Sequence, residues 1–300
     1  MAVAVPTTMH LVSQVVLRRF CDQTGNLTAY RVDSGRSKRV GPAGVGYVDD
    51  LDPVNPFAFE QRWKAVEDRL PEALVAVEEG SIFDSTSLVD LLRDCLAMHW
   101  ARSHNLVAMY ESVLPRILWD QEEQMLCDPM VDHIFRSQHQ GLWPAGPEGR
   151  ALGARRVRER VVEMFHASGF LPQRMLANFD EARARVAGVP LQIVLAGPGE
   201  FLIGDSPAQS LNKDRAGVGP LGGVPWGDAT TVTMPLGRRH AIALGRQSEY
   251  VCLDQRQVDI VNRFQLSAAR CQVAWHPDAS VRGFVEAYFV GQDGATVMNP

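Results

Sequence analysis

Apolar side chains recur at every third or fourth position through much of the first two thirds of the chain. From residue 59 to 79 this spacing is typical of one face of an amphipathic helix, and Pro71 predicts a break within it. We therefore expect a helical region over residues 57–188. The same spacing predicts helices at 11–20, 85–104, 121–138, 154–167 and 172–187, with 108–118 extending or following the second of these.

Strand patterns lie on both sides of this helical region. Alternating residues around the turn Asp33, Ser34 and Gly35 predict a hairpin over residues 26–40. A tight turn is expected at 197–199, between the first two strands of the C-terminal third. The strands expected in that third are 191–195, 200–204, 230–236, 240–244 and 284–290, with a helix at 254–275.

These elements together predict an α+β fold in a single domain over residues 1–300. A helical subregion at 57–188 packs with a mostly antiparallel sheet, which is formed by the hairpin at 26–40 and a sheet-rich subregion at 189–300. Residues 206–228 carry five glycines after Ala216 and almost no periodicity, which is typical of a functional lid or a mobile loop.

Composition and charge narrow the classes of partner and the location. The 300-residue chain has a net charge of −5 and a pI near 5.9, which argues against a broad basic surface for nucleic acid or anionic lipid. Arginines between residues 150 and 160 are a candidate basic patch, but a solvated helix face explains them better. The five cysteines are isolated, and no apolar run is long enough to span a membrane. We therefore expect a cytoplasmic protein with reduced thiols.

Charged side chains interrupt two of the predicted apolar helix faces. Glu60 and Glu67 share the stripe that contains Trp63, while His99 and Arg102 lie on the apolar face of the next helix. A buried carboxylate needs a partner, and the planar guanidinium group of arginine suits a bidentate pair. We expect Arg102 to pair with these carboxylates. The structural alternatives are two glutamates at the edge of the stripe and a satisfied core histidine.

Two further positions carry candidate groups. His10, Gln14 and Arg18 fall at steps of four along the first predicted helix, and His10 is a candidate proton carrier or metal ligand. Asp205 ends an apolar strand directly before the long loop, a common place for functional side chains. A plain Asp-Ser-Pro turn explains Asp205 equally well.

Six short segments share their order with a known family. They include Phe-Leu-Ile-Gly-Asp-Ser-Pro at 201–207, and the others are 9–20, 59–67, 99–102, 234–236 and 261–269. Over nearly the whole chain this combination resembles the domain of unknown function 4238 family. The family usually has Gln where His99 stands and Arg where Arg102 stands, so the resemblance favours Arg102, and its last segment adds Asn262. Gly204 and Ser206 depart from the family pattern. The resemblance implies an architecture and a set of positions, without a reaction.

The leading hypothesis is a hydrolase that acts on a phosphorylated or nucleic-acid-like anionic substrate. Its catalytic residues are His10, Glu60, Glu67 and Asp205, and its substrate-binding residues are Arg18, Arg102, His99 and Asn262. Glu60, Glu67 and Asp205 supply the oxygen ligands that Mg²⁺ or Mn²⁺ prefers. This hypothesis requires residues from distant parts of the chain to meet in one cleft.

Two alternatives use the same residues differently. A non-catalytic binding or regulatory protein would use them as a buried ion-pair network that specifies how the helices pack. A tailoring enzyme for a peptide or a small molecule would share the cleft and need a cofactor that the sequence does not indicate.

Overall fold

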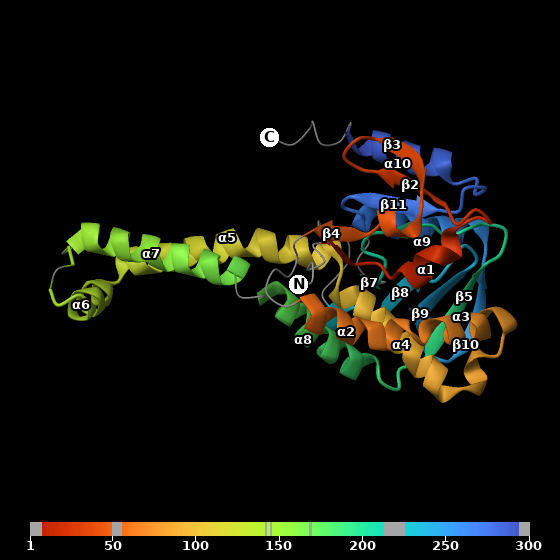
Figure 1. Ribbon diagram of the computed structural model, residues 1–300, viewed down its shortest axis with the longest axis horizontal. Helices are drawn as coiled ribbons and strands as arrows, with labels where there is room; N and C mark the ends of the chain where they lie inside the picture. The colour runs from red at the N-terminus through yellow and green to blue at the C-terminus, as the bar shows by residue number, and fades with distance from the viewer. Residues whose placement is uncertain are drawn as a thin grey trace, which may run out of the picture.

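The computed structural model describes residues 8–49, 56–141, 143–144, 146–167, 170–212 and 226–293. Figure 1 shows a body in which helices pack against sheets, and a long helical arm that projects from this body. The α+β class predicted from the sequence is confirmed. Residues 213–225, the centre of the loop predicted at 206–228, lie outside the described residues.

Four helices of the body follow the predicted apolar spacing. Helix α2 (Pro56–Glu67) ends before α3 (Leu70–Glu79), whose first turn contains Pro71, so the predicted break is confirmed. Helix α4 (Thr86–Ala101) contacts α2, α3, α8 (Phe170–Val186) and the larger sheet. Because α4 is surrounded, the polar groups at its C-terminal end have to find partners within the chain.

The arm consists of three helices at the middle of the chain. Helix α5 (His104–Cys127) leaves the body, α6 (Pro129–Gln138) lies at the far end, and α7 (Gly146–Ala167) returns alongside α5. The Asp128 carboxylate accepts a hydrogen bond of 2.8 Å from the Met130 N–H and so caps α6. The clustered arginines are exposed on α7, as expected for a solvated helix face.

The larger sheet of the body has the strand order β10–β5–β9–β8–β7. Strand β10 runs parallel to β5, and the other neighbours are antiparallel. The two strands predicted at 230–236 and 240–244 are confirmed, and they pair antiparallel with each other. The strands are β5 (Leu191–Ala196), β7 (Gln209–Leu211), β8 (Thr231–Pro235), β9 (His240–Leu244) and β10 (Glu249–Leu253).

A second, fully antiparallel sheet has the order β3–β2–β11–β6. Its strands are β2 (Leu27–Arg31), β3 (Arg36–Val40), β6 (Ile203–Gly204) and β11 (Gln272–Trp275). Strands β2 and β3 form the predicted hairpin. Helix α9 (Gln255–Ala268) contacts strands of both sheets, so it joins them.

The first predicted helix is shorter than its pattern suggests. Helix α1 (Gln14–Leu17) continues as a 3₁₀ turn to Phe20, and β1 (Thr8–His10) pairs with β4 (Tyr47–Asp49). His10 therefore ends a strand, and the prediction that it lies on the first helix is wrong. Over so few residues, the spacing of the apolar side chains cannot distinguish a short strand from a helical turn.

The tight turn predicted between 191–195 and 200–204 is also wrong. Strands β5 and β6 belong to different sheets, because the chain crosses from one to the other after Gly197. The Arg239 guanidinium donates hydrogen bonds to the carbonyl oxygens of Gly197 and Gly199 and holds this crossing. Phe201, Leu202 and Ile203 are all buried, so alternation gives no signal about which sheet they enter.

Two predictions near the C-terminus need correction, one in length and one in type. The helix expected at 254–275 ends at Ala268, and its last turn is replaced by β11. The strand expected at 284–290 is part of helix α10 (Arg282–Asp293). Val285 of α10 packs in a small second core with Leu202 and Val273, so tertiary burial overrides the strand propensity of the aromatic run.

Candidate functional site

Arg102 and Glu67 form an ion pair where α4 ends beside the end of α2. The Arg102 side chain is 1% exposed, and its Nη2 donates a hydrogen bond to Glu67 Oε1. Its guanidinium carbon lies 5.5 Å from the centre of the Trp63 ring, within reach of a cation–π interaction. The predicted pairing of this arginine with a carboxylate of the neighbouring helix is confirmed.

The two carboxyl groups of α2 have pKa values that shift in opposite directions. Burial raises the pKa of Glu67, but the charge and hydrogen bond of Arg102 outweigh burial, so the pKa of Glu67 is lowered. Burial is also the largest cause for Glu60, and with the charge of Glu67 it raises the pKa of Glu60 against the opposing charges of Arg102 and His10. The structure thus brings His10, Glu60, Glu67 and Arg102 into one electrostatic cluster.

His99 completes the buried side of this cluster. Its Nε2 accepts a hydrogen bond of 3.0 Å from the Ser13 N–H, and its Nδ1 lies 2.8 Å from the Cys95 carbonyl oxygen. These partners assign the neutral ring with a proton on Nδ1. Burial and the charge of Arg102 lower the pKa of His99 to about 3. Both ring nitrogens are therefore occupied by the backbone, and the ring is neutral near pH 7.

His10 and Arg18 are less buried than His99. His10 is half-buried, with Nε2 3.2 Å from the Gln14 Nε2 and 3.3 Å from the Ala43 carbonyl oxygen. Arg18 is exposed.

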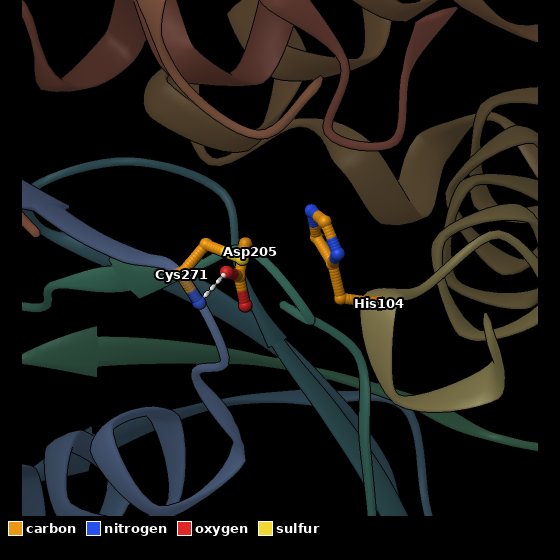
Figure 2. A group of neighbouring side chains, drawn as sticks. All are labelled: His104, Asp205 and Cys271. Carbon is orange, nitrogen blue, oxygen red and sulfur yellow. Dashed lines mark hydrogen bonds between the residues drawn. The ribbon is translucent and has the colours of Figure 1, made fainter. Parts of the chain in front are cut away.

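Asp205 belongs to a different set of residues. Its side chain is fully buried, and its two oxygens accept hydrogen bonds from the backbone N–H groups of Arg270, Cys271 and Gln272 at 3.0, 2.6 and 2.9 Å. Figure 2 shows His104, Asp205 and Cys271 facing a common space, and their potential ligand atoms all lie within 4.8 Å of one another.

The expected metal ligands do not gather as the sequence suggested. Among the described residues, the group of His, Cys, Asp or Glu side chains that meets this spacing contains Asp205 but neither Glu60 nor Glu67. His104 and Cys271 were not predicted. His104 opens a helix and Cys271 precedes a strand, and neither position carries a signal in the sequence, because their proximity depends on the fold alone.

Asn262 acts as a clamp between α9 and the chain before β6. Its Oδ1 accepts a hydrogen bond of 3.1 Å from the Leu202 N–H, and its Nδ2 donates one of 2.8 Å to the Glu200 carbonyl oxygen. Gln265, one turn later, makes the same pair of contacts with Gly204 and Pro207. The Asn262 amide is thus used to position the backbone beside Asp205.

Comparison with known proteins identifies no relative of this chain. No protein-family model, curated protein or solved structure matches the chain. The resemblance to the domain of unknown function 4238 family therefore stays a prediction. Within the described residues, no helix combines the length and apolar character that a membrane crossing needs.

Proposed function

We propose that this protein is a hydrolase in which Glu60 transfers the proton and the Glu67–Arg102 pair supplies fixed charge beside it. The observation that supports this proposal is the opposite shift of two carboxyl pKa values around one arginine. Carboxyl groups with separated pKa values hold different protonation states at one pH, which acid–base catalysis of hydrolysis requires. Glu60 is the group that keeps its proton longer as the pH rises.

The remaining residues of the cluster would serve this proton transfer. His10 is half-buried, and its charge acts on Glu60, so its imidazole supplies a second group beside Glu60 that can carry a proton. Arg102 is already bound to Glu67, so the positive charge that attracts an anionic substrate would come from the exposed Arg18. The substrate class we propose is a phosphorylated or nucleic-acid-like anion. Glu60 and Glu67 also offer oxygen ligands of the kind that suit Mg²⁺ or Mn²⁺.

Hydrolysis assays on phosphoesters test this proposal. Wild-type protein is assayed with a phosphate monoester, a phosphate diester and a single-stranded oligonucleotide, each with and without Mg²⁺ and Mn²⁺. Glu60→Gln is expected to lower kcat/KM by at least about 100-fold, because it removes the transferable proton, and to leave the melting temperature unchanged. Glu72→Gln, the same change at an exposed position of α3, is the matched control. An inactive wild type or a fully active Glu60→Gln variant contradicts the proposal.

A second candidate is a non-catalytic binding or regulatory protein. It is favoured by the predicted site residues that already have partners within the chain. Arg102 is paired with Glu67, and the side chains of His99, Asp205 and Asn262 are hydrogen-bonded to the backbone. Removing one partner of such a network is destabilising by about 3–5 kcal/mol when the remaining charge is buried. An inactive wild type together with a large loss of stability in Glu67→Gln would favour this candidate.

A further inference from the structure

Three side chains from distant parts of the chain converge at the base of the arm. His104 is the first residue of α5, Asp205 follows β6, and Cys271 directly precedes β11. Their potential ligand atoms lie within 4.8 Å of one another, and Figure 2 shows the His104 ring opposite the Asp205 carboxylate and the Cys271 side chain. This cluster is separate from the carboxyl groups of the proposed hydrolase site.

The carboxylate of Asp205 is held in one orientation. The Arg270 N–H occupies one lone pair of Oδ1, and the N–H groups of Cys271 and Gln272 both bind Oδ2. Oδ1 therefore keeps a lone pair for a further partner. Hydrogen bonds that orient a ligand in this way are typical of the groups around a metal site.

The three segments that carry these side chains are tied to one another by their neighbouring residues. The Asn105 N–H donates to Ser206 Oγ at 3.1 Å, which joins the residue after His104 to the residue after Asp205. The Arg270 Nε donates to Asn105 Oδ1 at 2.8 Å, which joins the residue before Cys271 to the same asparagine. The backbones around the cluster are thus fixed, whereas Cys271 is exposed and His104 is half-buried, so both side chains have room to adjust.

The donor set favours one kind of ion. Imidazole nitrogen, thiolate sulfur and a single carboxylate oxygen match the ligands of Zn²⁺, while Mg²⁺ requires mainly oxygen donors. Donor atoms about 2.0–2.3 Å from a tetrahedral zinc ion lie roughly 3.3–3.8 Å apart, so the cluster needs to contract by about 1 Å. Among the described residues the His104 ring has no hydrogen-bond partner that such a movement would break.

We propose that His104, Asp205 and Cys271 form a three-ligand zinc site. The Cys271 thiol gives its proton to the solvent when it binds the ion, and the thiolate and carboxylate then balance the charge of Zn²⁺. A water molecule takes the fourth position of the tetrahedron, as in zinc sites with three protein ligands. The site goes beyond the proposed hydrolase function, since it uses none of its residues.

Metal titration of the 300-residue chain tests this site. Protein stripped with a chelator is titrated with Zn²⁺ by calorimetry and with Co²⁺ by absorption spectroscopy. We expect one ion per chain and a thiolate-to-cobalt charge-transfer band in the near ultraviolet. Cys271→Ser is expected to abolish the band and to weaken zinc binding by at least about tenfold, and His104→Ala to weaken it to a similar extent.

Matched variants separate this site from unspecific binding. Cys127→Ser changes an exposed cysteine of the arm, and His133→Ala changes an exposed histidine of α6, so both should bind zinc as the wild type does. Melting curves of the metal-free variants confirm that each folds. Absence of zinc binding in the wild type, or an unchanged cobalt band in Cys271→Ser, overturns the proposal. Neither result depends on hydrolase activity, so the two proposals fail independently.

Discussion

At the scale of single residues, His99 is held by hydrogen bonds on both sides of its ring. Its ring projects from α4 and is fully buried, and its two nitrogens contact the backbone at Ser13 and Cys95. Through Ser13 it anchors the N-terminal segment, which carries His10, against the helix that carries Arg102. The ring is therefore a positioning element of the candidate site and depends on remaining uncharged.

The neutral state of His99 predicts that stability falls in mild acid. Its pKa is about 3 in the folded protein and about 6.5 in the unfolded chain, so the unfolded chain binds the extra proton between these values. Stability from this group is complete above about pH 6.5 and is lost progressively as the pH falls toward 3. The free energy of unfolding should drop by about 2 kcal/mol between pH 7.5 and pH 5 through this group.

Denaturant unfolding of His99→Gln at several pH values checks this prediction. Glutamine keeps an acceptor for the Ser13 N–H and cannot take up a proton, so the variant should lose this part of the pH dependence. The lowered pKa of Glu67 acts in the same direction but below about pH 4.5, and the raised pKa of Glu60 acts in the opposite direction. Equal pH slopes for the variant and the wild type between pH 5 and 6.5 would contradict the prediction, and the exposed His133→Gln serves as the control.

At the scale of secondary-structure elements, Asp205 decides where α9 stops. Ala269 leaves the helix with extended backbone angles, and the next three N–H groups turn toward the Asp205 carboxylate. Strand β11 begins at the third of them. A side chain 65 residues away in sequence thus replaces the last helical turn by a strand.

Asp205→Asn is expected to lower the free energy of unfolding by about 2–4 kcal/mol. The amide offers one acceptor oxygen, and its NH₂ group would face N–H donors that then stay unsatisfied in a buried place. Chemical denaturation measures the loss, and Asp84→Asn, at an exposed position, controls for the change of charge. A variant as stable as the wild type would show that the carboxylate does not fix this junction.

How far the sequence predicts these elements depends on whether the information is local. The spacing around Trp63 predicted α2 and α3, because apolar stripes are local signals. The pairing of Glu67 with Arg102 was expected on a different ground, since a buried carboxylate needs a partner. The end of α9 was missed because it depends on Asp205, and α10 was missed because its aromatic residues pack as a helix against Leu202. The proximity of His104 and Cys271 was likewise set by long-range contacts.

At the scale of the whole molecule, the arm sets the shape. Helices α5 and α7 extend away from the body, and several apolar side chains near the far end are exposed, among them Trp119 at 71% and Met130 at 60%. Both residues lie far from the two candidate sites, which are at the body. The far part of the arm therefore neither lines the hydrolase cluster nor packs on the sheets.

Small-angle X-ray scattering should report this elongated shape. A compact chain of 300 residues has a radius of gyration of about 19 Å. We expect a larger value, with a distance distribution that extends in a long tail, because the arm places mass far from the centre. A radius near that of a compact chain and a symmetric distribution would mean that the arm folds back on the body in solution.

The position of His104 links the zinc site to the orientation of the arm. This residue is the first of α5, so whatever fixes its side chain also fixes the pivot of a rod 24 residues long. At 1.5 Å per residue the rod measures about 36 Å, and a tilt of about 5° at the pivot displaces its far end by roughly 3 Å. A sub-ångström adjustment at the body is thereby magnified at the distant tip.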